Sequence, residues 1–232
     1  MFEMTNLSVS VNGHQLLRID SLSMPREGCI FVLGPNGAGK STLLRTLVGL
    51  QDYTGRIQWS QDNWNQVPSL KKSKLISWVP SQTVLSFDIS VFDLVMLGRY
   101  PMHAGYPKAD DRNAVDSLLS RLGIDSFRHR FMSSLSSGEQ QKVHIARALA
   151  AECRLMVLDE PCAHLDLKAR FELMDMLKTS GAMIIMASHD HLLAEAFASH
   201  SLLIRNGQVD ALLEGCPDRK DLEALYGITI PG

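Results

Sequence analysis

Long apolar runs and paired cysteines are both missing from this sequence of 232 residues. No segment reaches the ~18 consecutive apolar residues that a membrane-spanning helix needs, and residues 1–12 lack the basic start and apolar stretch of a signal peptide. The four cysteines do not fall into CxxC or metal-ligand spacings. These absences predict a cytosolic chain with reduced, structural thiols. Any membrane role must therefore come from a partner.

Charge of one sign is also scarce. The chain carries 23 basic and 25 acidic residues, a formal net charge of −2, which provides no general attraction to nucleic acid or to an acidic membrane surface. We therefore expect no nucleic-acid partner. The apolar fraction of 45% is ordinary for a globular protein, and the length allows one large domain with a sizeable core.

Apolar periodicity predicts an α/β fold. Apolar and polar residues alternate over 7–22 around Asn12-Gly13, which indicates antiparallel strands joined by a tight turn. The continuous apolar run Cys29–Leu33 is typical of a strand buried on both faces. Along the rest of the chain we expect a helix at 40–50, strands at 56–59 and 75–79, a helical region at 91–122 broken by Pro101 and Pro107, a helix at 138–151, a strand–helix–strand unit at 155–158, 168–179 and 183–187, a hairpin at 201–213 and a helix at 218–226. The strand–helix–strand unit implies parallel strands.

A glycine-rich segment connects the strand Cys29–Leu33 to the following helix. It matches the phosphate-binding pattern GxxxxGK[ST] and consists of Gly34, Pro35, Asn36, Gly37, Ala38, Gly39, Lys40 and Ser41. The backbone N–H groups of such a loop, together with the helix N-terminus, hold a polyphosphate. Lys40 adds a positive charge for the β- and γ-phosphates, and Ser41 offers a hydroxyl to Mg²⁺. A plain glycine-rich turn would leave Lys40 and Ser41 unexplained, so the segment predicts Mg·ATP binding. Kinases, GTPases and motor ATPases share this loop, so it does not fix the reaction.

Two adjacent carboxylates, Asp159 and Glu160, follow the apolar run 155–158. Burying a charge at the end of a core strand is costly unless the charge is paired, and ligands of open α/β sheets bind at the carboxyl ends of strands. Asp159 is therefore a candidate for the Mg²⁺ shell, and Glu160 for the group that polarises an attacking water. A water-activating glutamate favours hydrolysis over transfer to an acceptor. The alternative for Glu160 is a carboxylate that only stabilises a helix start.

The segment 135–139, which reads Leu-Ser-Ser-Gly-Glu, opens the helix expected at 138–151. Taken alone it indicates a capped helix with Ser136 as the N-cap. Its place upstream of Asp159 and Glu160 makes it resemble the LSGGQ signature of ATP-binding-cassette (ABC) ATPases. The resemblance continues in the family's order, with the phosphate loop at 34–42, the Q-loop at Gln82, the signature, the acidic strand at 155–161, the D-loop at Leu165 and Asp166, and the switch histidine in Ser188-His189-Asp190.

This resemblance implies a fold and a set of site residues. The fold is a P-loop NTPase core with a mainly parallel sheet and an antiparallel β subdomain at 1–84 and 153–232, and an inserted α-helical subdomain at 85–152. In this family two cassettes meet head to tail, and each signature helix faces the ATP held by the other copy's phosphate loop. Glu160 and His189 would be catalytic, and Ser41, Gln82 and Asp159 would hold Mg²⁺. The implied ATP contacts are Gly34, Pro35, Asn36, Gly37, Ala38, Gly39, Lys40, Ser41, Thr42, Gln82, Ser136, Gly138, Glu139 and Asp166. Without the resemblance, Gln82 would be an ordinary polar loop residue and His189 a neighbour of a helix cap.

The chain departs from the family's pattern at three positions. Ser137 replaces the first signature glycine and Glu139 replaces the signature glutamine. Val11 stands where the family has an aromatic residue that stacks on adenine, and we do not expect His14 to replace it. Adenine binding or base selectivity should therefore be weaker than in typical members.

The segment 90–102, which reads SVFDLVMLGRYPM, resembles the TVxDLVxLGRxP segment of importer cassettes for iron–siderophore, haem, cobalamin and related metal chelates. Part of it is an amphipathic helix, but we do not expect helix packing to require the LGRYP stretch at 97–101. The resemblance implies two copies of this chain on two transmembrane permease subunits fed by a substrate-binding protein. The chain would then sit peripherally on the cytoplasmic face of the inner membrane. Because the cargo never touches this chain, the sequence does not name it.

Three other functions are compatible with a phosphate loop. A non-transport cassette of the DNA-repair or translation type would carry coiled-coil inserts or tandem cassettes, and the sequence has neither. A small-molecule phosphotransferase is disfavoured by the signature and by Glu160. An exporter cassette would commonly be fused to membrane spans. Our interpretation of the sequence is therefore the ATPase of an importer.

Overall fold

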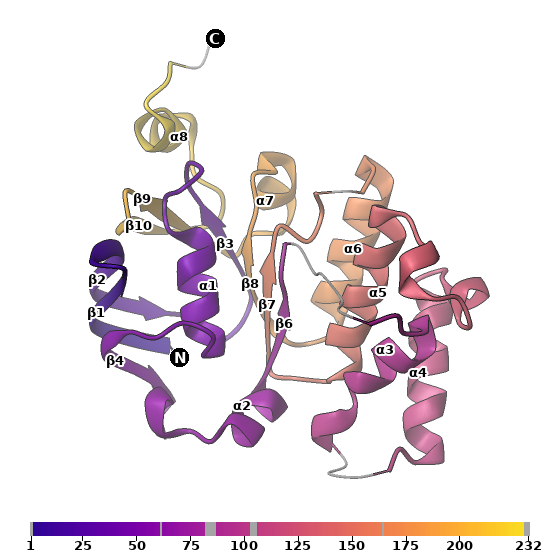
Figure 1. The fold of residues 1–232 in the computed structure, drawn as a ribbon. Coiled ribbons are helices and arrows are strands. Elements are labelled where there is room, and N and C mark those ends of the chain that lie inside the picture. Colours follow the sequence, from indigo (N-terminus) through magenta and orange to yellow (C-terminus); the bar gives the residue numbers. More distant parts are fainter. Residues whose placement is uncertain (1, 61, 82–86, 103–105, 164, 230–232) are drawn as a thin grey trace. The chain divides into compact units, whose positions relative to one another are not determined.

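A computed structural model describes residues 2–60, 62–81, 87–102, 106–163 and 165–229 (Figure 1). The chain divides into two compact units. Unit 1 comprises Met1–Pro68, Val157–Glu160 and Met183–Gly232, and unit 2 comprises Ser69–Met156 and Pro161–Ala182. The strand β7 (Leu155–Asp159) therefore begins in unit 2 and ends in unit 1.

Unit 1 begins with an antiparallel sheet. β1 (Phe2–Val11) pairs with β2 (His14–Met24) on one side and with β4 (Thr54–Trp59) on the other, and β5 (Asp62–Asn63) pairs with β4. The turn at Asn12-Gly13 has φ angles of 51° and 80°, as a two-residue hairpin loop requires. The hairpin predicted at this turn is confirmed.

The second part of unit 1 is a largely parallel sheet. β3 (Cys29–Leu33) pairs in parallel with β8 (Met183–Ala187) and with β9 (His200–Arg205), and β10 (Gln208–Glu214) forms a hairpin with β9. Every residue of β3, β7 and β8 is buried, as the continuous apolar runs predict. The strand order in this unit is β5-β4-β1-β2-β10-β9-β3-β8-β7. A mixed sheet with a parallel centre and an antiparallel part agrees with the predicted fold class.

Three α-helices of unit 1 follow strands of the sheet. α1 (Lys40–Val48) follows β3, α7 (His191–Phe197) follows β8, and α8 (Arg219–Tyr226) follows β10. The 3₁₀ helix η1 (Trp64–Gln66) comes after the antiparallel strands. α1 ends at Val48, before the predicted end at residue 50, because Gly49 adopts a left-handed φ of 80° and stops the helix. Because β3 and β8 are parallel, the loops after both strands emerge at the same edge of the sheet.

Unit 2 is mainly helical. Its α-helices are α2 (Ser69–Leu75), α3 (Val91–Leu97), α4 (Ala109–Arg121), α5 (Ser137–Ala150) and α6 (Leu167–Thr179), and its 3₁₀ helices are η2 (Tyr100–Met102), η3 (Asp125–Phe127) and η4 (Met132–Ser134). Its core contains residues of α3, α4 and α5, with Val95, Val115 and Val143 fully buried. The helical region predicted at 91–122 is confirmed, with α3 and α4 separated around Pro101 and Pro107.

The sequence does not predict α2. None of its residues is buried, so the segment has no apolar stripe from which a helical period could be detected. The strand expected at 75–79 is β6 (Ile76–Val79), because Leu75 is the last residue of α2. In strand order β6 is next to β7.

Helix packing requires Gly98 in the LGRYP stretch, contrary to our expectation. A Cβ added at Gly98 would lie 2.1 Å from the carbonyl oxygen of Arg147 and 3.0 Å from the Cβ of Ala150, both on α5. A protein interior is packed too densely to absorb such an overlap without moving an element. Any larger residue at this position would push α3 away from α5.

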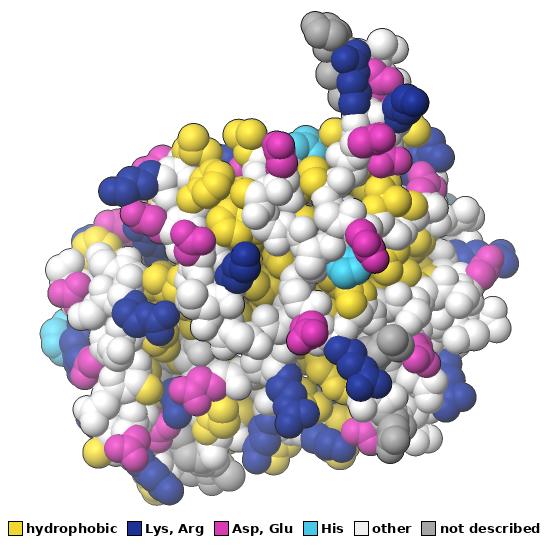
Figure 2. Space-filling view, turned by 180° about the vertical axis from the view of Figure 1, so that it is seen from behind, with side chains coloured by type: hydrophobic (Ala, Val, Ile, Leu, Met, Phe, Trp, Pro, Cys, Tyr) yellow, Lys and Arg dark blue, Asp and Glu magenta, His cyan; other side chains and the backbone are white. Residues whose placement is uncertain are grey.

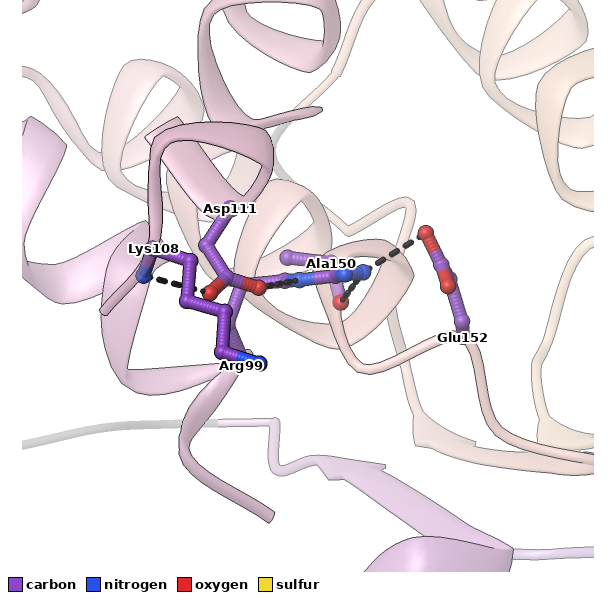
Figure 3. Close-up of polar contacts among 5 residues, drawn as sticks. All are labelled: Arg99, Lys108, Asp111, Ala150 and Glu152. Carbon is purple, nitrogen blue, oxygen red and sulfur yellow. Dashed lines mark hydrogen bonds and ion pairs between the residues drawn. The ribbon is translucent and has the colours of Figure 1, made fainter. Parts of the chain in front are cut away.

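Arg99, the next residue, joins three helices of unit 2 (Figure 3). Its Nε donates to Asp111 Oδ1 at 3.0 Å, near the start of α4, and its guanidinium donates to the carbonyl of Ala150 at 3.1 Å, at the end of α5. The guanidinium also pairs with Glu152 at 2.6 Å. Asp111 in turn accepts the backbone N–H of Lys108 and so caps α4. The Gly-Arg pair is a structural junction of unit 2, whereas the large apolar side chains of Leu97, Tyr100 and Met102 beside it are exposed.

The surface carries no broad field of one sign on the face that Figure 2 shows. Basic and acidic side chains are interspersed over it, together with scattered apolar ones, as expected from the net charge of −2. Among the residues that the structure describes, no helix is both long enough and apolar enough to cross a membrane.

Candidate active site

The phosphate loop lies between β3 and α1 in unit 1, as predicted. Gly34 has a φ of 155°, and a Cβ at this position would lie 2.0 Å from the carbonyl oxygen of Ile204 on β9. Gly39 has a φ of 105° and is the N-cap of α1. It provides no side chain to cap the helix, and the first turn contains no acidic residue. The amide donors at the start of α1 are therefore open to an external anion.

The turn between β9 and β10 supports the phosphate loop through a backbone hydrogen bond. The backbone N–H of Gly207 donates to Ala38 O at 2.9 Å, and Arg18 N donates to Gly207 O at 2.6 Å. A Cβ at Gly207 would lie 2.7 Å from Leu16 O, so only glycine fits between the loop and β2. The sequence marks Asn206-Gly207 as a hairpin turn but gives no sign that this turn also holds the phosphate loop.

The Lys40 ammonium group lies inside its own loop. Nζ donates to Gly34 O at 2.7 Å and to Pro35 O at 3.0 Å. Burial lowers the pKa of Lys40, and the negative charges of Glu160 and Asp159 oppose that decrease. The two carboxylates thus lie within electrostatic range of the lysine, which places the predicted cation and both predicted acids in one cluster.

The two acids occupy different positions at the end of β7. Asp159 is the last residue of the strand and is 2% exposed. Glu160 follows it with a φ of 51°, and its N–H donates to Ala187 O of β8 at 3.0 Å. A left-handed backbone costs about 1–3 kcal/mol for a residue other than glycine, and such strained residues recur at active sites. The two side chains also differ in exposure, because that of Glu160 is 23% exposed.

Burial raises the pKa of Glu160 to about 7, and the charge of Lys40 opposes the increase. A carboxylate with a pKa near 7 is a far better proton acceptor than an ordinary glutamate, whose pKa is about 4.3. The electrostatics of Glu160 therefore suit a general base at neutral pH.

His189 contacts Glu160. Its Nε2 lies 3.0 Å from Glu160 Oε1. Burial lowers the pKa of His189, and the nearby Lys40 acts in the same direction, so the imidazole is neutral at pH 7. The neighbouring Asp190 caps α7 by accepting the N–H of Leu193 at 3.1 Å. Because Asp190 performs the capping, His189 does not have to, and its side chain is directed to Glu160.

The signature residues lie in unit 2, at the start of α5. Ser136 is the N-cap, as predicted, and it forms a capping box with Glu139. The N–H and the hydroxyl of Ser136 both donate to Glu139 Oε2, at 2.8 and 2.7 Å. These hydrogen bonds lower the pKa of Glu139, so its carboxylate is charged at neutral pH. Gly138 is half-buried in the first turn of α5.

The remaining predicted residues are dispersed. Asp166 is the N-cap of α6 in unit 2 and accepts the N–H of Ala169 at 2.8 Å. Gln82 lies outside the described residues. In unit 1, Val11 and His14 are paired across the β1–β2 hairpin, and both are exposed. The structure thus brings together Lys40, Asp159, Glu160 and His189, and it places the signature and Asp166 in the other unit.

The part of the chain that the structure describes contains no group of three or more His, Cys, Asp and Glu residues arranged as a metal site. Asp159 and the Ser41 hydroxyl are oxygen donors of the kind that Mg²⁺ prefers, and Mg²⁺ commonly takes only one or two protein ligands beside substrate phosphates and water. The donor set therefore suits a cation that arrives with a nucleotide.

Comparisons with known proteins agree with this geometry. Residues 17–163 match the family model described as ABC transporter. Over 215 residues the chain is 37% identical to the hemin import ATP-binding protein HmuV of Deinococcus radiodurans, covering 89% of this chain and 82% of that protein. It is also 34% identical to the manganese transport system ATP-binding protein MntB of Halalkalibacterium halodurans, over 86% of this chain and 80% of that one.

Solved structures give the same result. A metal-chelate type ABC transporter in an inward-facing conformation superposes with a TM-score of 0.76 at 28% identity. The superposition covers 97% of this chain and 87% of the matched chain.

Proposed function

The chain belongs to the ABC transporter family, whose ATP-binding subunits hydrolyse ATP to power transport, and we propose that it drives uptake of a metal chelate through a membrane permease. The observation that supports hydrolysis best is the contact of 3.0 Å between His189 and Glu160. This pair lies beside Lys40, the cation of the phosphate loop.

In this proposal the phosphate loop binds the triphosphate. The open amides at the start of α1 and the Lys40 ammonium would face the β- and γ-phosphates. Lys40 now donates to Gly34 O and Pro35 O, so it would exchange at least part of these contacts for phosphate oxygens. Gly37 and Asn36 form the loop's exposed outer turn, and Thr42 continues α1 after Ser41.

Ser41, Asp159 and Gln82 would hold the Mg²⁺ that accompanies ATP. When bound, Mg²⁺ neutralises charge that develops on the transferring phosphoryl group. Asp159 is buried within electrostatic range of Lys40, a position that suits a cation ligand.

Glu160 would accept a proton from the attacking water, and His189 would orient both the glutamate and the γ-phosphate. A neutral imidazole suits this role, because its Nε2 can hydrogen-bond to Glu160 without forming a charged salt bridge. The raised pKa of Glu160 makes the proton transfer favourable near neutral pH.

The signature lies in unit 2 and the phosphate loop in unit 1, and we propose that the signature of a second copy completes the site. Ser136, Gly138 and Glu139 of that copy would approach the phosphate, and its Asp166 would lie at the same interface. We propose residues 85–152 as the helical subdomain that presents this signature, and residues 1–84 and 153–232 as the catalytic core. The start of a helix binds anions through its free amides and its dipole.

The cargo class rests on relatives. These relatives are a hemin import protein and a manganese transport protein, so a metal or metal chelate is the cargo class that they share. The partners would be two permease subunits and, through them, a substrate-binding protein. The chain would lie on the cytoplasmic face of the membrane.

The reaction is tested with the purified chain and Mg·ATP. We expect free phosphate to be released into water, and a phosphorylated small-molecule acceptor in place of free phosphate would overturn the proposal.

The membrane partner is tested by co-purification. Tagged chain purified from gently solubilised membranes should bring down a permease of several membrane-spanning helices. The matched control is Lys40→Ala, which should still bring down the permease but release no phosphate.

A further inference from the structure

The C-terminal helix α8 (Arg219–Tyr226) of unit 1 places an aromatic side chain next to the active site. α8 lies beyond the edge of the sheet at which β3 ends (Figure 1). Arg205 of β9 fixes its last turn by donating to Ala224 O at 3.0 Å. Asp218 caps its start with a capping box that includes Asp221. The helix is therefore held at both ends, and its final residue, Tyr226, has a defined position.

The ring of Tyr226 packs on His191. The two ring centroids are 5.8 Å apart and the planes are perpendicular, an edge-to-face geometry that is favourable for aromatic pairs. His191 is the first residue of α7 and stands two positions after His189. Tyr226 thus supports the short turn that presents His189 to Glu160.

The phenol group of Tyr226 lies within electrostatic range of the same cluster. The Tyr226 oxygen is buried. Burial raises the pKa of Tyr226, the backbone of Gly34 opposes this, and the charge of Glu160 adds to it. Gly34 is the first residue of the phosphate loop, so Tyr226 lies within reach of the loop, the histidine turn and the glutamate at once.

We propose that Tyr226 is a positioning residue for hydrolysis, which holds the His189–Glu160 pair in its working geometry through the edge-to-face contact with His191. This inference rests on the proposed ATPase function. Tyr226 does not touch a reacting atom. Its removal should leave ATP binding intact, because Lys40 and the α1 amides do not depend on it, and should lower the rate of the chemical step.

The test compares Tyr226→Ala and Tyr226→Phe with a matched control. Tyr53 is another half-buried tyrosine of unit 1, whose pKa is raised to about 12 by burial alone, without any influence of Glu160. Tyr53→Ala should therefore reproduce the loss of a half-buried tyrosine without affecting the site. The measurements are kcat and KM for Mg·ATP, the affinity for ATP and the thermal midpoint.

We expect Tyr226→Ala to lower kcat about tenfold, since small displacements of catalytic groups have large effects on rate, with the ATP affinity unchanged within about twofold. Tyr226→Phe keeps the ring and should restore kcat to within about twofold of the parent, and Tyr53→Ala should leave kcat unchanged. Full kcat in Tyr226→Ala, or a loss that Phe does not restore, would overturn the inference. If the unaltered chain released no phosphate, the proposed function itself would fail instead.

Discussion

The two helix starts that would meet a triphosphate differ in how they are capped. α1 in unit 1 begins at Gly39, with no capping side chain and no acidic residue in its first turn. α5 in unit 2 begins at Ser136, whose N–H and hydroxyl are both bound to the carboxylate of Glu139. The start of α1 is open to an external anion, and the start of α5 is already occupied by the carboxylate of Glu139. An anion can therefore bind directly at α1, whereas a phosphate at α5 would meet the carboxylate of Glu139.

This difference suggests a division of work. Unit 1 carries the cation, the acids and the histidine, so it can bind ATP and perform the chemistry. Unit 2 contains the start of α5, where Glu139 provides the local charge. In the same unit Gly98 and Arg99 hold α3, α4 and α5 together. The predictions below test this division, from the largest expected effect to the smallest.

Glu160→Gln should lower kcat by ~10²-fold or more, as expected when a positioned proton acceptor is removed. ATP affinity should persist, because the amides of α1 and Lys40 remain, and an ATP-bound dimer should accumulate. Phosphate release and size-exclusion chromatography with Mg·ATP measure both. An unchanged turnover would show that the chemistry does not depend on Glu160.

Arg99→Ala should lower the stability of unit 2 by about 3 kcal/mol, because it removes the positive charge that pairs with the buried carboxylate of Asp111. The side chains of Arg99 and Asp111 are 12% and 7% exposed. The control is Arg128→Ala, which breaks the more exposed pair with Asp116 and should cost less than about 1 kcal/mol. Thermal unfolding compares the two, and equal losses would contradict the role of the Arg99 junction.

Lys40→Ala should weaken ATP binding roughly 10- to 100-fold, the range expected for the loss of one charge-assisted contact to phosphate. Equilibrium binding of a fluorescent ATP analogue measures this. If binding depended on unit 2 instead, Lys40→Ala would bind ATP as well as the parent chain.

The pH dependence follows from the state of Glu160. Its carboxyl must be unprotonated to accept a proton, and burial raises its pKa to about 7, so it is mostly protonated at pH 6 and mostly ionised at pH 8. We expect kcat/KM to rise up to about tenfold per pH unit below pH 7 and to level off above it. The residual activity of Glu160→Gln should lack this inflection. A midpoint near 4.5 in the parent chain would contradict the raised pKa.

Glu139→Gln should have the smallest effect, and it should strengthen ATP-dependent dimerisation where the other variants lose activity, binding or stability. It removes a negative charge from the start of α5 while keeping a hydrogen-bond acceptor for Ser136. The ATP-bound dimer of Glu160→Gln should then form at a concentration about threefold lower, because a phosphate no longer faces a carboxylate at the helix start. Weaker dimerisation would mean that the Glu139 charge assists assembly.

Much of the fold could be predicted from sequence because burial leaves a pattern. The fully apolar runs at β3, β7 and β8 and the Asn12-Gly13 turn indicated the sheet. α2 could not be predicted, because an exposed helix leaves no apolar period. Local sequence patterns also do not show which residues distant in the chain will be in contact. The packing role of Gly98 depends on Arg147, and the support that Gly207 gives to the phosphate loop depends on Ala38.

The candidate site shows the same limit. Sequence motifs indicated Lys40, Asp159, Glu160 and His189, and the structure brings these four residues into one cluster. The left-handed backbone of Glu160 and the approach of Tyr226 were not indicated. A positive φ at a glutamate and an aromatic contact from the last helix are properties of the assembled fold, so no local pattern carries them.

The most direct test of the shared site mixes two inactive variants in the Glu160→Gln background. One carries Lys40→Ala and the other carries Ser136→Ala, and the measurement is the amount of ATP that stays bound after dilution. If each site combines Lys40 of one copy with Ser136 of the other, mixed dimers contain one intact site. Equal mixing should then restore occlusion to about a quarter of the level of the background chain. Occlusion no higher than in either variant alone would contradict a site shared between copies.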